Sequence, residues 1–586
     1  MLRDLTCNEI SKKDIGKEVT LAGWVHSVRD HGGVLFVDLR DKYGVSQIVF
    51  NDDNSNKLLS NVNDSLKREY VIQVKGKVRK RSDDTFNPKI KTGEVEVLAS
   101  SVNVLSKSVP IPFEIGESEK INEETRLKYR FLDLRGQRMQ DNLAQRHHAN
   151  LAARNLLTKQ GFVEIETPLL VRSTPEGARD YVVPSRVNPG KFYALPQSPQ
   201  LYKQMLMVSG ADKYFQFARC LRDEDLRADR QPEHTQLDME MSFVEQDDVF
   251  EIVENVISEI AFSVKNKKPK LPFQRLKYSD AMSKYGTDKP DLRFGLEISD
   301  VTDIVAKSDF SVFKSVISSG GKVKMLNPEF VLARPEFDKY IEYVQSLGGK
   351  GMAWMVRGDK LDSNIVKYFP ENVQKDLLKN SRKGSLLFIA DKEKNALDVA
   401  GKLRLKIAED KDMIKKDELN FCWVVDFPLF AWNEDTDRWD PEHHMFTMPK
   451  KESLQYLEEK NYHPEKVIAD CYDLVLNGVE LASGSIRISD SEIQSKVMKV
   501  VSYTDEEIEQ KFGFLLDAFK YGVPPHGGIG IGFDRLIALL LGYNDIREVI
   551  AFPKNKSAES LIDKCPSEIT QKQLKELKLK LDIVKK

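Results

Sequence analysis

The sequence predicts a multidomain protein of the α+β class, and three observations lead to this prediction. The chain has 586 residues, enough for three or four domains of ordinary size. Its first hundred or so residues contain five short runs rich in β-branched and aromatic residues. Between about Phe273 and Asn420 the chain becomes rich in Lys, Ser and Gly, with strand-like segments on either side. We therefore expect an N-terminal β domain and a sheet-based core that is interrupted by an inserted domain.

The composition limits the possible partners and locations. Lys plus Arg (89) nearly balance Asp plus Glu (91), so any nucleic acid would have to be met by local patches of charge. The five cysteines are scattered without a CxxC pair, which argues against a disulfide framework or a zinc site. The N-terminus lacks an apolar signal core, and the longest apolar run, near Leu536–Leu541, is too short to cross a bilayer. We expect a cytoplasmic protein that does not enter a membrane.

The N-terminal runs have the order of an OB-fold barrel. Five strands with a helix after the third are characteristic of that fold, and a helical pattern near Lys57–Leu66 follows the third run. The five runs are Val19–Val25, Val34–Leu39, Val45–Phe50, Tyr70–Val78 and Val95–Val104.

Two residues of this barrel indicate a nucleic-acid surface. Phe36 falls on the outward, polar face of the second run, and Gln47 is out of phase with its apolar neighbour Ile48. Exposed aromatic residues among polar neighbours are how OB-folds stack on unpaired bases. The alternative is an isolated surface phenylalanine, which is common in proteins.

A polar connector leads into a helix and a strand. Asn142–Gln160 has helical character, and Gly161 is placed to end the helix. The strand Phe162–Thr167 follows and is stopped by Pro168. This helix and strand form either a dimer element or an edge of the sheet.

The segment beginning at Ser198 predicts a helix start. Ser198 can cap the helix, and Pro199 suits the first helical position. Gln200 and Lys203 then share one face. Lys203 is either part of a site or an ordinary surface lysine.

The segment from Arg219 to Phe243 predicts two strands joined by a highly charged loop. Strand alternation places Arg222 with Glu224 on one face, and Asp238 with Glu240 on one face. A fixed guanidinium suits a phosphate, and carboxylates suit Mg²⁺ or an ammonium group. The competing interpretation is a solvated charged hairpin.

A second hairpin is centred on Asn477-Gly478, the strongest short turn signal. In its register Asp473 and Glu480 converge on one surface, as a hard cation requires. Arg487 has the opposite parity unless the strand bulges within 482–485, which Gly484 permits. Upstream, the adjacent His443 and His444 point to opposite sides of an extended chain. A joint metal site is therefore disfavoured, and we expect one histidine to touch a ligand.

A glycine-rich strand, 526–532, enters a helix whose first turn carries Asp534 and Arg535. The glycines would let a flat ligand approach the backbone, and Arg535 could reach a phosphate or stack on a base. The spacing matches neither the P-loop nor the dinucleotide fingerprint. Combined with Arg222 and the paired acids, this strand predicts a nucleotide site.

These segments together resemble a known family. Gly161–Pro168, Arg222–Glu240 and Gly530–Arg535 resemble motifs 1, 2 and 3 of class II aminoacyl-tRNA synthetases. The segments TPEGARDY, QSPQLYKQ, YGTDKPDLRF and LRDEDLRADRQPEHTQ are similar to those of bacterial-type aspartyl-tRNA synthetases, and the likeness covers nearly the whole chain. The resemblance implies an antiparallel-sheet catalytic core, a homodimer, and the charging of tRNA with L-aspartate, dependent on ATP and Mg²⁺.

The resemblance also implies roles for individual residues. Arg222 and Arg535 are the expected catalytic residues, and Asp473 and Glu480 the expected Mg²⁺ ligands. Expected around ATP are Arg222, Asp223, Glu224, Gln231, Glu480, Gly532, Phe533, Asp534 and Arg535. Expected around aspartate are Glu176, Ser198, Gln200, Lys203, Asp238, His443 and Arg487. Expected at the tRNA anticodon are Arg29, His31, Phe36 and Gln47.

The resemblance bears on tRNA specificity through His31, Gly32 and Asp84. Family members with histidine in the loop of His31 and Gly32 tend to charge both tRNA(Asp) and tRNA(Asn). The identity of Asp84 does not distinguish dual from strict tRNA specificity. We therefore expect dual specificity; the alternative is a strictly tRNA(Asp)-specific enzyme. An alternative from another class is an inactive RNA-binding paralogue. Such a protein would lack at least one ATP-contacting position, and all of them are present here.

Within the enzyme class the alternatives are asparaginyl- and lysyl-type relatives, which lack the long insertion.

The expected domain boundaries follow from these motifs. They are an OB-fold anticodon-binding domain (1–105), a hinge (106–138), the catalytic core in two parts (139–285 and 421–556), the inserted α+β domain (286–420) and a C-terminal extension (557–586).

Overall fold

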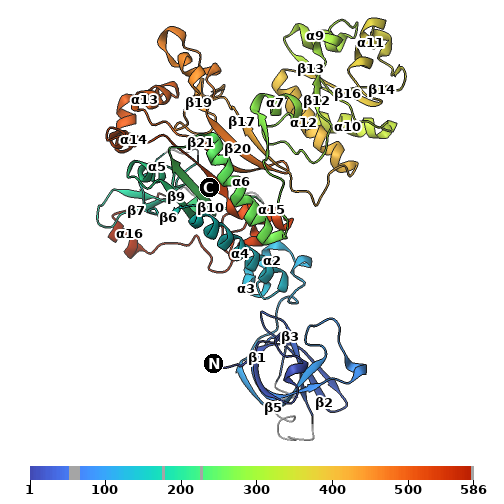
Figure 1. The fold of residues 1–586 in the computed structure, drawn as a ribbon, viewed down its shortest axis with the longest axis vertical. Helices are drawn as coiled ribbons and strands as arrows, with labels where there is room; N and C mark the ends of the chain where they lie inside the picture. The colour runs from blue at the N-terminus through green and yellow to red at the C-terminus, as the bar shows by residue number, and fades with distance from the viewer. Residues whose placement is uncertain (52–65, 175–177, 225–228, 583–586) are drawn as a thin grey trace. The chain divides into compact units, whose positions relative to one another are not determined.

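The computed structural model describes residues 1–51, 66–174, 178–224 and 229–582. The chain forms two compact units (Figure 1). The first contains Met1–Ala144 with Ala551–Asn555 and Glu559–Cys565. The second contains Gln145–Ile550 with the remaining C-terminal residues. The helix expected near Lys57–Leu66 falls almost wholly outside the described residues.

The first unit contains a closed five-stranded barrel in the order β1-β2-β3-β5-β4, which confirms the OB-fold prediction. The barrel closes where β3 pairs in parallel with β5. Alternate side chains of each strand, such as Val37, Ile48 and Val74, fill its interior. The strands are β1 (Glu18–His31), β2 (Val34–Arg40), β3 (Val45–Phe50), β4 (Val71–Lys80) and β5 (Val95–Ser106).

Three helices follow the barrel: α2 (Glu123–Lys128), α3 (Arg130–Asp133) and α4 (Gln137–Lys159). Asn122 caps α2 by accepting a hydrogen bond from the backbone of Thr125. The α4 helix begins earlier than predicted and ends as predicted before Gly161, whose φ of +85° favours glycine.

The second unit is built on an eight-stranded sheet in the order β11-β17-β20-β21-β22-β10-β9-β6. Its central strands are antiparallel, and only the β11–β17 and β6–β9 pairs are parallel. The β6 strand is shorter than predicted because it pairs only with Tyr214 and Phe215. The strands are β6 (Val163–Glu164), β9 (Lys213–Leu221), β10 (Glu233–Ser242), β11 (Gln274–Lys277), β17 (Phe421–Val425), β20 (Cys471–Leu476), β21 (Val479–Ile486) and β22 (His526–Gly532).

The two faces of this sheet differ in chemistry. Leu237 and Met239 of β10 and Ile531 of β22 point into the larger apolar core, beneath α6 and α15. The alternate residues of β10, Asp238 and Glu240, therefore point to the opposite face. The helices of the unit outside the insertion are α5 (Gln200–Val208), α6 (Gln246–Lys265), α7 (Tyr278–Tyr285), α13 (Ser491–Val500), α14 (Asp505–Phe519), α15 (Phe533–Leu541) and α16 (Gln571–Leu577). Two short hairpins complete it: β7 (Val182–Pro184) with β8 (Phe192–Ala194), and β18 (Phe430–Asn433) with β19 (Arg438–Pro441).

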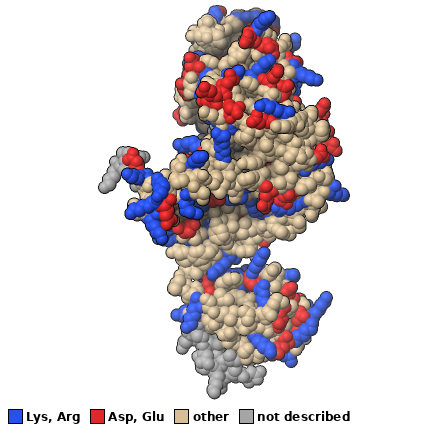
Figure 2. Space-filling model, turned by 90° about the vertical axis from the view of Figure 1, so that its left-hand side faces the viewer, with Lys and Arg blue, Asp and Glu red and all other residues tan. Residues whose placement is uncertain are grey.

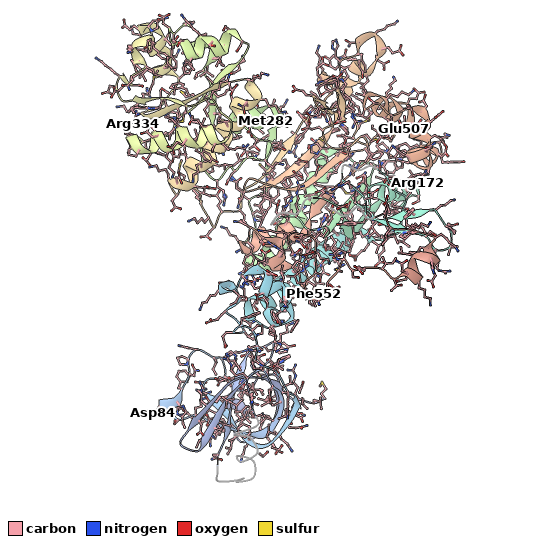
Figure 3. The ribbon with its side chains drawn as sticks, turned by 180° about the vertical axis from the view of Figure 1, so that it is seen from behind. Asp84, Arg172, Met282, Arg334, Glu507 and Phe552 are labelled. Carbon is pink, nitrogen blue, oxygen red and sulfur yellow. The ribbon has the colours of Figure 1, made fainter. Side chains whose placement is uncertain are left out.

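The segment between β11 and β17 forms its own antiparallel sheet, in the order β12-β13-β16-β14-β15. Apolar clusters cover both of its faces beneath the helices, and Figure 3 labels Arg334 on α10 in this segment. The strands are β12 (Ile298–Asp300), β13 (Lys322–Leu326), β14 (Ala353–Arg357), β15 (Leu361–Asp362) and β16 (Gly384–Asp391). The helices are α8 (Thr302–Val305), α9 (Ser311–Ser318), α10 (Arg334–Ser346), α11 (Glu371–Lys379) and α12 (Glu393–Asp410).

Charges of both signs are interspersed over the molecular face in Figure 2, as the nearly balanced composition predicts. Among the described residues, no helix combines the length and apolar character that crossing a membrane requires.

Candidate active site

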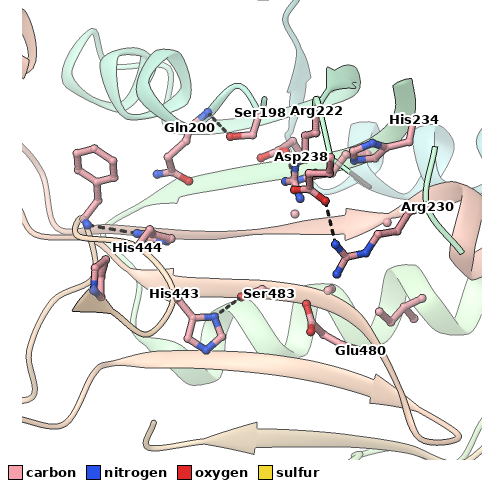
Figure 4. Close-up of a pocket in the computed structure, with 18 of the residues that line it drawn as sticks. Ser198, Gln200, Arg222, Arg230, His234, Asp238, His443, His444, Glu480 and Ser483 are labelled. Carbon is pink, nitrogen blue, oxygen red and sulfur yellow. Dashed lines mark hydrogen bonds and ion pairs between the residues drawn. The ribbon is translucent and has the colours of Figure 1, made fainter. Parts of the chain in front are cut away.

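A cavity of about 1140 Å³ opens on the polar face of the eight-stranded sheet. Ser198 and Gln200 lie across the cavity from His443 and Ser483 (Figure 4). Pockets for drug-sized ligands measure about 300–1000 Å³, so this cavity can hold a nucleotide together with a small second substrate. It contains side chains from α5, β10, β21, β22 and α15, which are far apart in the sequence.

The charged hairpin gives this cavity a site for anions. Arg222 follows β9, and its guanidinium has no ion pair with any residue that the structure describes; its Nε donates to the carbonyl of Gln197 at 3.4 Å. Burial and the nearby cations Arg222, Arg535 and Arg219 lower the pKa of His234 to about 3, so His234 is neutral. Of these cations Arg222 and Arg535 line the cavity, where two guanidinium groups favour phosphate groups.

Beneath α5 lies a cluster of four buried charges. Lys203 Nζ contacts Asp238 Oδ1 and lies 3.1 Å from Glu240 Oε2. Arg487 donates to Glu240 through Nε at 2.9 Å and through a terminal nitrogen at 3.2 Å. The exposed fractions are 0% for both acids and 2% for both bases. Charges that are removed from water in this way are costly unless they are paired with opposite charges. Here the two positive charges balance the two negative ones.

The pKa values of the two acids differ because their partners differ. Burial raises the pKa of Asp238, and the opposing effect of Lys203 does not cancel this rise. Burial would also raise the pKa of Glu240, but Arg487 and Lys203 outweigh it and lower the pKa to about 2. Glu240 thus holds both cations as a carboxylate. It was absent from the predicted site residues, although its alternation with Asp238 was a usable signal.

The β20–β21 hairpin has the predicted turn but a different bulge. Val475 pairs with Glu480 as predicted, and the register then shifts so that Leu481 is the extra residue. The bulge predicted within 482–485 is therefore wrong in position, because Leu481 turns into the apolar core. The shift returns Arg487 to the face of Glu480.

Both predicted histidines line the cavity. His443 Nδ1 lies 3.3 Å from Ser483 Oγ and 3.9 Å from Asp473 Oδ1. His444 Nε2 lies 2.9 Å from a terminal nitrogen of Arg487. Burial, followed by the charge of Arg487, lowers the pKa of His444, so this ring is neutral. The expectation that one of the two histidines touches a ligand stays a prediction.

The residues predicted to bind a metal fit a magnesium ion that is shared with phosphates. Asp473 is 2% exposed, and its Oδ1 is a buried oxygen without a hydrogen-bond partner. Burial, with the charge of Glu480 adding to it, raises the pKa of Asp473 to about 7. The described residues contain no cluster of three or more protein ligands. Mg²⁺ is commonly held by one or two carboxylates, waters and substrate phosphates, which suits Asp473 and Glu480.

At two positions of β22, glycine is needed because atoms of the neighbouring strand β10 occupy the place of a side chain. A Cβ at Gly528 would lie 2.1 Å from the carbonyl of Met239, and one at Gly530 would lie 1.8 Å from Gln236 Nε2. At Gly532 the nearest atom would be 3.4 Å away, so that position leaves space. Gly530 and Gly532 line the cavity, whereas the space beside Gly528 is filled by β10.

Motif 3 residues in α15 have three different roles. Arg535 lines the cavity and donates to the carbonyl of Glu480 at 2.8 Å. Asp534 contacts Arg146 and accepts a hydrogen bond from the backbone N–H of Thr235 at 2.8 Å, so it ties α4 and β10 to α15. Phe533 is fully buried and its ring packs against Phe217, so a contact with ATP would have to come from its backbone.

The other predicted cavity residues divide into three groups. Ser198, Gln200, Glu224 and Gln231 line the cavity. The backbone of Asp223 pairs with that of Arg179, and its predicted contact with ATP stays a prediction. Glu176 lies outside the described residues.

The predicted anticodon residues lie on the barrel of the first unit. Arg29 pairs with Asp38 at 2.9 Å, and the His31 ring packs edge-on against Phe36 at 5.8 Å between ring centroids. Gly32 lies in the β1–β2 turn with a φ of +61°, and Asp84 is exposed in a short helical turn. Gln47 is only 7% exposed and donates to Glu96 at 2.9 Å, so its side-chain amide is bound to another residue of the barrel.

Comparisons with known proteins define the class. The family described as "tRNA synthetases class II (D, K and N)" matches residues 122–556, and "OB-fold nucleic acid binding domain" matches residues 19–105. The chain therefore belongs to the class II tRNA synthetases.

Relatives narrow this to the aspartate–tRNA ligases within that class. Proteins named "Aspartate--tRNA(Asp/Asn) ligase" from Thermodesulfovibrio yellowstonii and Aquifex aeolicus are 48% and 49% identical to this chain. The first match covers 100% of both chains, and the second covers 98% of both. "Aspartate--tRNA ligase" of Staphylococcus saprophyticus is 47% identical over 99% of both chains.

A solved structure shares the fold. The asparaginyl-tRNA synthetase of Pyrococcus horikoshii, complexed with asparaginyl-adenylate, aligns over 94% of this chain and 98% of its own with a TM-score of 0.59. At 19% identity, this likeness supports the fold alone.

Proposed function

We propose that this cavity catalyses ATP-dependent aspartylation of tRNA through an aspartyl-adenylate. One observation carries the proposal: a single cavity joins the cation Arg222, free of any ion pair among the described residues, to the buried Lys203–Arg487 cluster. The first can bind a phosphate and the second a substrate carboxylate. Aspartate-dependent exchange of pyrophosphate into ATP tests the first step.

The chemistry requires no side-chain nucleophile. An oxygen of the α-carboxylate of aspartate forms a bond to the α-phosphorus, and the bond to the leaving pyrophosphate breaks. Arg222 and Arg535 would offset the charge that develops on the phosphate oxygens. The terminal ribose hydroxyl of tRNA then attacks the aspartyl carbonyl, AMP leaves, and the hydroxyl proton is released.

Asp473 and Glu480 would hold Mg²⁺. When bound, the ion would neutralise the phosphate oxygens of ATP. The buried, unpartnered Oδ1 of Asp473 supports this assignment.

Selection against asparagine follows from the donor-only cations. Lys203 and Arg487 have N–H groups but no acceptors, so the side-chain amide N–H groups of asparagine would face other donors. Buried donors left without an acceptor make asparagine the poorer substrate. Ser198, Gln200 and Asp238 would receive the substrate ammonium, with Glu176 as a further candidate. His443 would close over the substrate.

We propose that both tRNA(Asp) and tRNA(Asn) are substrates. The names of several relatives include both tRNAs, whereas that of the Staphylococcus saprophyticus relative does not. The anticodon would meet Arg29, His31, Phe36 and Gln47. Gln47 would first have to leave Glu96. Aspartylation of a purified tRNA(Asn) transcript decides the question, because a strictly tRNA(Asp)-specific enzyme leaves that transcript uncharged.

A homodimer is also part of the proposal. Exposed apolar side chains near α4 and the β6 edge argue for a partner surface. They are Leu151, Val163, Leu169, Leu170 and Val182. Light scattering of the wild type and of Leu151→Glu/Val163→Glu tests it, and a monomeric wild type would contradict it. A cytoplasmic location and the domain boundaries given above complete the proposal.

A further inference from the structure

We propose that Lys289 acts as an internal counter-ion of the carboxylate site and transfers to the polyphosphate when Mg²⁺ and ATP bind. The inference rests on the proposed function, because it assumes that Glu480 and Asp473 receive the metal. Sequence reasoning did not assign Lys289 to the site.

The ammonium group of Lys289 lies close to the carboxylates of Glu480 and Asp288. Lys289 Nζ lies 3.1 Å from Glu480 Oε2 and 3.6 Å from Asp288 Oδ2. Lys289 also lines the same cavity as Arg222 and Arg535. A metal ion at Glu480 and an ammonium group 3.1 Å from the same oxygen would repel each other. The arrival of one therefore displaces the other.

The backbone that carries Lys289 is fixed at both ends. Gly286 has a φ of +68° and packs so closely on α12 that a Cβ there would lie 2.1 Å from the carbonyl of Leu397. At the other end Asp291 packs on the β20–β21 turn, where a Cβ at Gly478 would lie 3.1 Å from its Cβ.

A residue of the inserted segment holds the loop that carries Lys289 in place. Arg404 of α12 is buried, and one of its terminal nitrogens donates to the carbonyls of Asp291, at 2.8 Å, and Phe294, at 3.1 Å. Its guanidinium also stacks over the Phe294 ring at 4.1 Å. One role of the insertion is therefore to position the loop that presents Lys289, and Arg404 is a positioning residue.

The side chain of Lys289, unlike its backbone, can move. Its side chain is 42% exposed and that of Glu480 is 38% exposed, so the pair faces the cavity. A lysine has a flexible four-carbon stem, and its ammonium can turn from a carboxylate to a nearby phosphate without moving the loop. The polyphosphate of ATP is the anion that this cavity would bring within reach.

The test is Mn²⁺ binding to the nucleotide-free enzyme, followed by electron paramagnetic resonance. Lys289→Met should bind Mn²⁺ about tenfold more tightly than the wild type, because the competing cation is gone. Adding Glu480→Gln should abolish that gain. Lys277→Met is the matched control, since Lys277 also pairs with an aspartate but lies outside the lining of the cavity; its affinity should equal that of the wild type.

The second readout is the KM for ATP in pyrophosphate exchange. Lys289→Met should raise it about tenfold, and Lys289→Arg should restore most of the loss. Unchanged Mn²⁺ affinity or an unchanged KM for ATP overturns the proposal. Failure of the proposed function is distinguishable, because the wild type would then show no aspartate-dependent exchange at all.

Discussion

Arg487 and Glu240 form a buried two-point ion pair, with nitrogen–oxygen distances of 2.9 and 3.2 Å. The pair joins β10 to the chain that follows β21, across the glycine strand between them. It sets the direction of the Arg487 guanidinium, whose other terminal nitrogen donates to Ser485 Oγ at 2.7 Å and lies 2.9 Å from His444 Nε2.

Replacing Arg487 by lysine tests this geometry while keeping the charge. The guanidinium fork would be lost, so we expect kcat/KM for aspartate to fall about 100-fold in pyrophosphate exchange. The KM for ATP should remain close to that of the wild type. Equal losses for both substrates would show instead that the whole cavity had been disturbed.

Arg222→Ala should reduce adenylate formation about 10³–10⁵-fold, the range found when a phosphate-stabilising arginine is lost. Binding of tRNA, measured by filter retention, should be largely unaffected. Arg219→Ala is the matched control, because Arg219 lies on the same strand but pairs with Glu233 and does not line the cavity. Loss of tRNA binding together with adenylate formation in Arg222→Ala would refute the division of roles.

Gly528 and Gly532 should respond differently to alanine. A methyl group at Gly528 meets the Met239 carbonyl and Glu240, so we expect unfolding to become easier by about 1–3 kcal/mol. At Gly532 there is space in the fold, so stability should hold while the KM for ATP rises. Thermal unfolding and exchange kinetics of the two variants check this, and a stable Gly528→Ala protein would contradict the packing argument.

His234 should make stability fall in mild acid. Folded His234 stays neutral down to about pH 3, whereas in the unfolded chain a histidine takes up a proton below about 6.5. The unfolded state binds more protons between these values, so stability decreases as the pH falls from about 6.5 to about 3. Urea unfolding of His234→Asn should show a shallower decline, and an identical decline would count against this assignment.

Strand alternation accounts for what the sequence predicted correctly. It placed Asp238 with Glu240 on one face, and the Asn-Gly turn fixed the pairing of Val475 with Glu480. Both signals are local, so neighbouring residues suffice to read them.

The predictions failed where the local structure depends on segments that are distant in the sequence. Which residue bulges depends on the core that receives Leu481, and the need for glycine at 528 depends on the neighbouring strand. The pairing of Lys289 with Glu480 joins residues 191 positions apart.

The central claim is that this cavity activates aspartate in preference to its near-isosteric and cationic alternatives. Pyrophosphate exchange with aspartate, asparagine and lysine as the amino acid tests it most directly. We predict exchange with aspartate and, for asparagine and lysine, none above the rate without amino acid. Exchange supported by asparagine or lysine, or no exchange with any of the three, would contradict the account.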